Sequence, residues 1–258
     1  MRPHERVKAA IEQSEGPAVV GFLTAGHPHP DRFLRDLAAI AEAADAVEIG
    51  VPFSDPMADG VTVQRSSRVA IEHGVSLRWI FAELERRDFE LAAPVLLMSY
   101  LNPLLAFGYE RLAARAAETG VCGFIVPDLP FEESGPLKAA LDAAGLALVQ
   151  LVTPATPRER LRRLAAESSG FLYAVTRTGT TGAGLSVPAE LAEYLAAVKA
   201  ASPLPVCAGF GVRERAHVEL IGRHVDGVIV GSALVEVLES GADPAAFLRG
   251  LKGRSATV

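Results

Sequence analysis

The chain has 258 residues, of which 50% are hydrophobic and 22% are charged, and its formal net charge is -6. So apolar a composition excludes a disordered chain, and mixed charges without a long basic block argue against a nucleic-acid partner. No apolar run approaches the roughly 18 residues that a membrane-spanning helix needs, and the N-terminal residues do not resemble a signal peptide. We therefore expect one domain over residues 1–258, located in the cytoplasm and without membrane contact.

Short apolar runs alternate along the whole chain with longer segments that have the spacing of amphipathic helices. Eight of these runs have the composition of strands: residues 18–26, 46–51, 94–100, 122–128, 146–152, 170–176, 204–211 and 226–232. Eight repeats of about 32 residues have the number and size expected for a closed barrel of parallel strands with outer helices. The sequence predicts an α/β fold, a single (β/α)8 TIM barrel with an additional N-terminal helix.

The alternative fold is an open, doubly wound sheet that binds a dinucleotide. Its GxGxxG fingerprint is missing after the first strand, where the sequence reads GFLTAGHPHP, and no lysine follows a glycine as a Walker loop requires. In a barrel the active site lies at the C-terminal ends of the strands, so polar residues there are the candidates.

The second strand and its loop, VEIGVPFSDPMADGVTVQ, carry three carboxylates. Glu48 lies near the end of an otherwise apolar strand, where a buried charge is costly unless an arginine or backbone donors satisfy it or it has a catalytic task. Asp59 is either a second site carboxylate or the N-cap of a helix that begins at Val61. Asp55 has the same ambiguity, because SDP is a common turn.

Two later segments have the glycines expected around an anion. The run TRTGTTGAG after the sixth strand can present backbone N–H groups or act as a lid, although a flexible connection has a similar composition. AGFG ends the seventh strand and VGSA the eighth, and Ser232 is placed to open a short helix whose N-terminus favours an anion. Because the loops after strands 7 and 8 are the usual phosphate site of this fold, we predict a phosphorylated substrate.

The sequence lacks the residues that several classes of enzyme need at their active sites. No lysine lies at a strand end, which argues against a Schiff-base enzyme and a lysine-anchored pyridoxal enzyme. His27 and His29 are better explained as loop residues than as ligands, and no metal site is expected. Cys122 and Cys207 lie in apolar runs, where buried reduced thiols are expected. Tyr173 in the sixth strand is either a core aromatic or a site residue.

Six motifs occur in a fixed order along the chain: EIGVPFSDPMADG, LLMSYLNPLLAFG, VPDLP, TGTTG, GFGV and GSALV. Together they resemble the tryptophan synthase alpha-subunit family from Val19 to Val237. The resemblance implies a (β/α)8 barrel that cleaves indole-3-glycerol phosphate to indole and glyceraldehyde 3-phosphate. This is a retro-aldol reaction that needs no metal or organic cofactor in this chain.

The resemblance also implies roles for individual residues. Glu48 is the implied general acid and base, and Asp59 is expected to hold the indole N–H. The loops around Asp59 and Gly182 are expected to close over the substrate. The implied walls of the indole pocket are Phe22, Ile125, Tyr173 and Ile229, and the implied phosphate cradle is Gly182, Phe210, Gly211, Gly231 and Ser232.

A partner is implied as well. In this family the alpha subunit forms an alpha2beta2 heterotetramer with a beta subunit that carries pyridoxal phosphate and receives the indole. The implied partner-facing residues are Pro52, Asp55, Asn102 and Pro103. Two alternatives stay open, a stand-alone indole-releasing lyase and an inactive subunit that only binds and activates a partner. Three residues depart from the family's usual pattern: Thr176 for Ser, Val61 for Pro and Ser99 for Gly.

Overall fold

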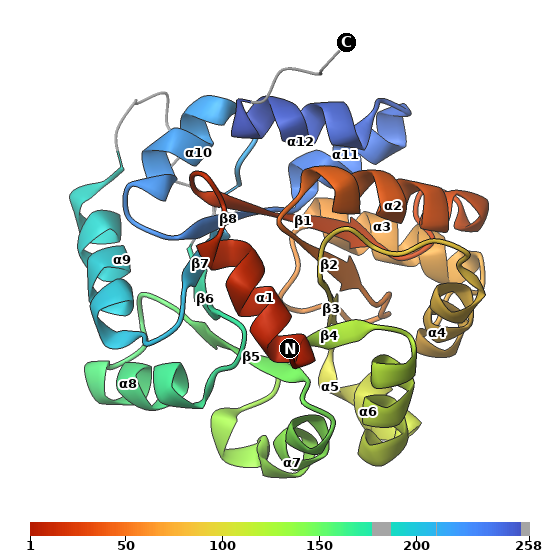
Figure 1. The fold of residues 1–258 in the computed structure, drawn as a ribbon, viewed down its shortest axis with the longest axis horizontal. Helices are drawn as coiled ribbons and strands as arrows, with labels where there is room; N and C mark the ends of the chain where they lie inside the picture. Colours follow the sequence, from red (N-terminus) through yellow and green to blue (C-terminus); the bar gives the residue numbers. More distant parts are fainter. Residues whose placement is uncertain (177–186, 210, 254–258) are drawn as a thin grey trace.

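A barrel of eight parallel strands forms the centre of the molecule. The computed structural model describes residues 1–176, 187–209 and 211–253. Each strand pairs with the strands before and after it in the chain, and β8 pairs with β1 to close the barrel (Figure 1). The predicted (β/α)8 barrel is therefore confirmed. The strands are β1 (Ala18–Thr24), β2 (Ala46–Gly50), β3 (Val95–Met98), β4 (Val121–Ile125), β5 (Ala147–Val152), β6 (Leu172–Val175), β7 (Val206–Gly209) and β8 (Gly227–Val230).

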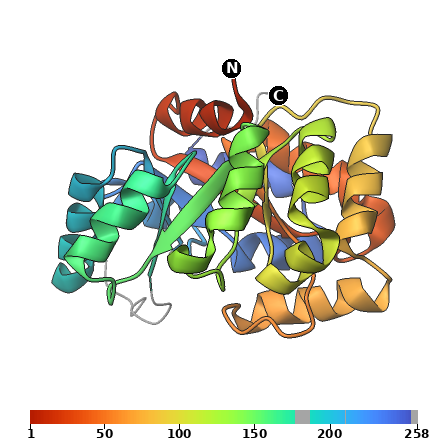
Figure 2. The same ribbon diagram turned by 90° about the horizontal axis from the view of Figure 1, so that it is seen from below.

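Helices surround the barrel, and the predicted extra helix at the N-terminus is present as α1. Figure 2 shows α1 at one end of the barrel and α3 at the opposite end. The described helices are α1 (Pro3–Glu12), α2 (Phe33–Ala43), α3 (Val61–Glu72), α4 (Leu77–Arg86), α5 (Leu101–Phe107), α6 (Tyr109–Glu118), α7 (Gly135–Ala143), α8 (Arg158–Glu167), α9 (Ala189–Ala201), α10 (Arg215–Gly222), α11 (Ser232–Ser240) and α12 (Pro244–Lys252), with short 3-10 helices η1 (Pro30–Arg32) and η2 (Phe131–Glu133). None of these helices is long and apolar enough to cross a membrane.

Two apolar clusters divide the core, one inside the barrel and one between the strands and the helices. Strand side chains alternate between them: on β2, Ala46 joins the inner cluster, and Val47 and Ile49 join the outer one. Helix α1 closes the inner cluster at the N-terminal ends of the strands, where it contributes Val7 and Ile11. By the same alternation Glu48 shares the inward face of β2 with Ala46, so the strand pattern delivers its carboxyl group to the barrel interior.

The last helix is fixed to the start of the barrel by a nearly buried ion pair. Lys252 Nζ lies 2.6 Å from Asp45 Oδ1, and their side chains are 7% and 13% exposed. The other carboxylate oxygen of Asp45 accepts the Val19 N–H at 2.7 Å. This contact joins the end of α12 to the first strand. Both cysteines, Cys122 and Cys207, are buried and free, as expected.

Candidate functional site

Glu48 is a buried acid without a hydrogen-bond partner. It is the middle residue of β2, paired in register with Phe22 of β1 and Leu96 of β3, and it is 0% exposed. Neither carboxyl oxygen has a partner within the described part of the chain, so the expected alternative of an arginine or backbone donor is not seen there. Burial raises the pKa of Glu48 to about 8. At neutral pH this side chain is therefore mostly protonated and can donate a proton.

Asp59 is the second carboxyl group at the C-terminal end of the strands. It lies half-buried in the loop between β2 and α3. The N-cap of α3 is Gly60, so Asp59 does not serve as the helix cap that its sequence position allowed. Burial raises the pKa of Asp59 to about 6, and a hydrogen bond from the Tyr100 hydroxyl opposes that rise. Asp59 is thus mostly ionised at neutral pH, in contrast to Glu48.

Tyr100 holds the Asp59 loop in place, a role that the sequence analysis missed. Its hydroxyl accepts the Ala58 N–H at 2.9 Å and bonds to the Asp59 carboxylate. Its ring stacks on Phe53, with ring centroids 5.2 Å apart. The available signal was the place of Tyr100 directly after the third strand, inside the motif LLMSYLNPLLAFG.

A narrow cleft lies beside Asp59 at the barrel mouth. Phe22, predicted as a wall of the indole pocket, is one of the residues that line this cleft. Gly50 leaves room for this ring, since a Cβ atom there would lie 2.6 Å from the Phe22 Cζ. The cleft therefore combines an aromatic wall with one carboxylate. Its lining consists of Phe22, Gly50, Val51, Asp59, Val63, Ser67, Met98, Ser99 and Tyr100.

The other three predicted pocket residues belong to the inner cluster of the barrel. Ile125 and Ile229 are buried at the ends of β4 and β8. Tyr173 packs against that cluster, and burial and then the nearby Glu48 charge raise the pKa of its hydroxyl. A Cβ atom at Gly209 would lie 2.9 Å from this hydroxyl, so the glycine makes room for it. Tyr173, undecided from the sequence, thus lies within electrostatic range of Glu48.

The predicted phosphate cradle is described in part. Gly231 is the N-cap of α11 and Ser232 its first residue, as expected from the sequence. A Cβ atom at Gly231 would meet nothing within 4 Å, so the space beside this helix start is open. Gly211 follows the neighbouring strand β7, is exposed and has φ +64°, a conformation that favours glycine. The other two predicted members, Gly182 and Phe210, lie outside the described residues.

The predicted partner-facing residues follow the adjacent strands β2 and β3. Asp55 and Asn102 are exposed and Pro103 is half-buried, whereas Pro52 is buried within the chain. Two exposed apolar side chains lie near them in sequence and were not predicted, Met57 (84% exposed) and Leu105 (58% exposed).

The three departures from the family pattern have simple structural settings. The Thr176 hydroxyl donates to the Gly209 carbonyl and so links the ends of β6 and β7. The buried Ser99 hydroxyl donates to the Tyr100 carbonyl at 2.9 Å. Val61 is the first residue of α3 and is 79% exposed.

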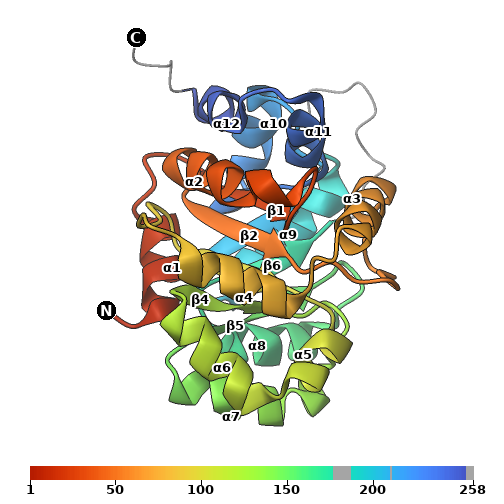
Figure 3. The same ribbon diagram turned by 90° about the vertical axis from the view of Figure 1, so that its right-hand side faces the viewer.

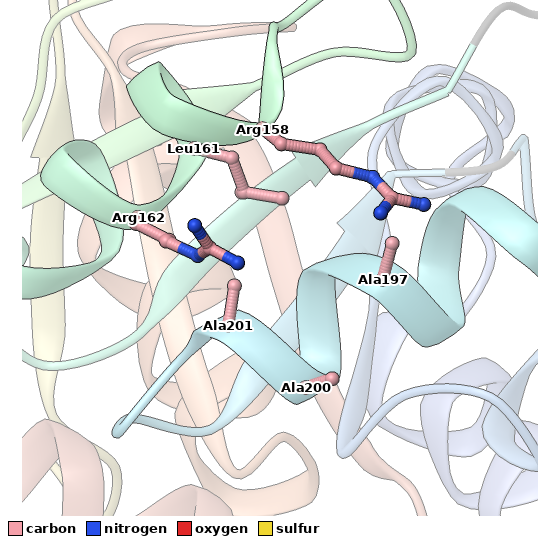
Figure 4. Close-up of a pocket in the computed structure, with 6 residues that line it drawn as sticks. All are labelled: Arg158, Leu161, Arg162, Ala197, Ala200 and Ala201. Carbon is pink, nitrogen blue, oxygen red and sulfur yellow. The ribbon is translucent and has the colours of Figure 1, made fainter.

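Other cavities lie away from these residues. A groove of about 570 Å³ separates α8 from α9, where Arg158 and Arg162 extend toward Ala197 and Ala201 (Figure 4). A wider hollow of about 1070 Å³ is lined by residues that precede β1, β7 and β8, at the end of the barrel opposite the cleft. Neither contains a predicted site residue. Among the residues with described positions, no group of three His, Cys, Asp or Glu side chains is placed to hold a metal ion.

Comparisons with known proteins identify relatives over nearly the whole chain. The family model for the tryptophan synthase alpha chain matches residues 8–251. The alpha chain of Nitratidesulfovibrio vulgaris strain DP4 is 45% identical over 250 residues, 96% of both chains, and that of Bacillus cereus strain AH820 is 44% identical over 237 residues, 92% of both. Among solved structures, an open form of tryptophan synthase from M. tuberculosis is similar with a TM-score of 0.87, 32% identity and 98% of both chains covered. Tryptophan synthase subunit alpha from Legionella pneumophila strain Paris has a TM-score of 0.87 at 30% identity, again over 98% of both chains.

Proposed function

The chain belongs to the tryptophan synthase alpha chain family, and we propose that Glu48 and Asp59 carry out the reaction of that family in it. It is a lyase that cleaves indole-3-glycerol phosphate to indole and glyceraldehyde 3-phosphate. The observation that supports the proposed roles is the contrast between the two carboxyl groups. The pKa of Glu48 is about 8 and that of Asp59 is about 6, so near pH 7 one is an acid and the other an anion.

Glu48 moves the protons of the cleavage. The bond between indole C3 and the glycerol chain breaks only after C3 gains a proton, and protonated Glu48 supplies it. The resulting carboxylate then takes the proton of the hydroxyl that becomes the aldehyde, which returns Glu48 to its starting state. Its burial without a hydrogen-bond partner, within the described residues, supports this role because it keeps the proton on the group at neutral pH.

Asp59 stabilises the charge that develops on the indole ring. Protonation at C3 leaves positive charge on the ring nitrogen, and an ionised carboxylate that accepts the N–H lowers the energy of that state. The hydrogen bond from Tyr100 keeps Asp59 oriented and favours its ionised form. Phe22 lines the same cleft as Asp59, so an indole ring bound beside Asp59 would lie against an aromatic side chain.

The remaining predicted residues complete the substrate site in this proposal. Ile125, Tyr173 and Ile229 close the apolar pocket from the barrel interior. The phosphate binds to backbone N–H groups at the start of α11 and at the neighbouring glycines, where the helix dipole favours an anion. The proposed cradle is Gly182, Phe210, Gly211, Gly231 and Ser232.

The family implies a beta-subunit partner, and its alpha reaction does not use pyridoxal phosphate. We infer further that this chain works without a cofactor of its own, in an alpha2beta2 heterotetramer whose beta subunits hold pyridoxal phosphate. The exposed Asp55 and Asn102, with Met57 and Leu105 beside them, support a partner surface next to the cleft. Of the two predicted prolines, Pro52 lies in the segment after β2 and Pro103 in the first turn of α5.

We also infer that residues 1–258 form one domain and that the protein acts in the cytoplasm. The closure of all eight strands into one barrel, with α1 and α12 packed on it, supports the first inference. The two free, buried cysteines support the second, since reduced thiols persist in that compartment.

An indole-release assay tests the proposed function. Purified protein should release indole from indole-3-glycerol phosphate, and addition of a beta subunit should raise the rate. A fast rate that the partner leaves unchanged would favour a stand-alone lyase. Absence of indole from the complete complex would favour a subunit that only binds its partner.

A further inference from the structure

A cluster of three polar side chains joins three elements of the proposed site. Glu239 lies in the last turn of α11, Arg65 in α3 and His27 in the loop after β1. Glu239 accepts hydrogen bonds from Arg65 Nε at 3.1 Å and Arg65 Nη2 at 2.6 Å, one on each carboxylate oxygen. His27 Nε2 lies 3.1 Å from Glu239 Oε1. Helices α3 and α11 lie side by side (Figure 3). The contact between Arg65 and Glu239 joins them.

The cluster combines the buried His27 with a more exposed ion pair, in which the Arg65 side chain is 50% exposed. The His27 side chain is 4% exposed and that of Glu239 26%. The hydrogen bond from Arg65 lowers the pKa of Glu239, and burial lowers the pKa of His27. Glu239 is therefore an anion and His27 neutral near pH 7, with the Nε2–H of His27 donating to Glu239. A bidentate, charge-assisted pair of this kind restrains distance and orientation together.

Helix α3 has a second attachment at Ser66, the residue after Arg65. The hydroxyls of Thr24 and Ser66 lie 2.6 Å apart and are both buried. Thr24 ends β1, so this contact ties α3 to the barrel, while Arg65 ties it to α11. The two neighbouring residues thus fix α3 against two different elements.

The position of α3 relative to α11 sets the distance between the groups that meet the two ends of the substrate. Asp59 lies two residues before the start of α3, and Arg65 lies one helical turn after that start. Ser232 begins α11, and Glu239 lies two turns further along. In the proposed site, Asp59 meets the indole end of the substrate and the start of α11 meets the phosphate end. The spacing between these ends depends on how the two helices pack.

We propose that Glu239 is a positioning residue for the alpha reaction: through Arg65 and His27 it sets the spacing between Asp59 and the phosphate end of the site. This rests on the proposed roles of Asp59 and Ser232. Loosening the cluster changes the distance across the substrate and leaves each half of the site locally intact. A misplaced catalytic group lowers turnover although no catalytic residue is changed.

The test measures the whole substrate and its two halves separately. Glu239→Gln and Arg65→Met should each lower kcat/KM for indole-3-glycerol phosphate about tenfold. Inhibition constants for indole and for inorganic phosphate should stay within about twofold of wild type, because neither probe spans both ends. The double variant should lose no more than either single variant, since both act through one contact. Arg65→Lys should lose less, because it keeps one of the hydrogen bonds.

The matched control is Arg160→Met. Arg160 forms the same kind of bidentate pair with Glu132, at 2.5 and 2.9 Å, but joins η2 to α8, neither of which carries a proposed site residue. This variant should keep wild-type kcat/KM. Circular dichroism first checks that Glu239→Gln and Arg65→Met are folded. The proposal is overturned if either folded variant keeps the wild-type kcat/KM. It is also overturned if a variant's affinity for indole alone, or for phosphate alone, falls as much as its kcat/KM. Failure of the proposed function has a different signature, because the wild type then releases no indole.

Discussion

The raised pKa of Glu48 results from its buried position in strand β2. The side chain has no hydrogen-bond partner in the described chain, and burial alone raises its pKa to about 8. Asp59 lies nearer to solvent and receives a hydrogen bond from Tyr100, so its pKa rises only to about 6. Two carboxyl groups with such different surroundings take opposite protonation states over a range of pH values that includes neutrality.

This contrast predicts a bell-shaped pH dependence of kcat/KM for indole release. Activity should rise as Asp59 loses its proton near pH 6 and fall as Glu48 loses its proton near pH 8. Replacing Tyr100 with Phe removes the hydrogen bond that favours the Asp59 anion, so the acidic limb should move to higher pH. The alkaline limb should stay in place, which makes it the internal control. An unchanged acidic limb in Tyr100→Phe would contradict the assignment of that limb to Asp59.

The two carboxyl groups differ in how far the sequence predicted their surroundings. Glu48 was predictable because a charged residue inside an apolar strand is costly wherever the strand lies in the barrel. Tyr100 was not singled out, because its bond to Asp59 depends on the shape of the loop that follows β2. A loop of this kind, with two prolines and an Asp-Gly pair, has no repeating pattern from which side-chain contacts follow.

At the level of elements, the start of α11 is the feature on which the proposed phosphate site depends. Gly231 and Ser232 occupy the cap and the first position of the helix, as the motif VGSA predicted. The sequence left Asp59 open as the cap of α3, and the structure gives that place to Gly60. The two candidates for the N-cap of α3, Asp59 and Gly60, are adjacent in the sequence. Local composition alone did not decide which of them is the cap.

Ser232→Asp should raise KM for indole-3-glycerol phosphate at least tenfold, because the new carboxylate repels the substrate phosphate at close range. The effect should shrink in high salt, which screens this repulsion in part. Gly135→Asp is the matched control, since it adds the same charge at the exposed first residue of α7. Equal KM values for Ser232→Asp and wild type would place the phosphate elsewhere.

At the scale of the whole molecule, the order and closure of the barrel followed from repetition in the sequence. Eight strand patterns separated by helical segments leave few ways to bury every strand on both faces. The contacts of Glu239 with residues 174 and 212 positions away did not follow from that pattern. Such contacts depend on which helix faces meet after closure, and the sequence pattern carries no information on that point.

The buried acid also makes the stability of the molecule depend on pH. Glu48 has a pKa of about 8 in the folded chain and an ordinary value of 4.5, so the folded state binds more protons between these values. The contribution of the raised Glu48 pKa to the free energy of unfolding is fully present below pH 4.5. It is lost as the pH rises from 4.5 to 8, by at most about 1.4 kcal/mol per pH unit. The glutamine in Glu48→Gln does not titrate. The free energy of unfolding of this variant, relative to that of the wild type, should therefore increase as the pH rises across this range.

Urea unfolding at pH 5 and pH 8 measures this difference. The exposed Glu90→Gln is the control, and its stability should change with pH in parallel with the wild type. If Glu48→Gln also runs parallel to the wild type, Glu48 is ionised in the folded protein and cannot act as the proton donor.

Indole release by the Glu48→Gln variant in complex with a beta subunit is the most direct measurement of the proposed chemistry. The amide keeps the size of the side chain but carries no proton that it can transfer. We expect a KM close to that of the wild type and a fall in kcat of about 100-fold to 10,000-fold. A wild-type kcat in Glu48→Gln would contradict the assignment of Glu48 as the general acid and base.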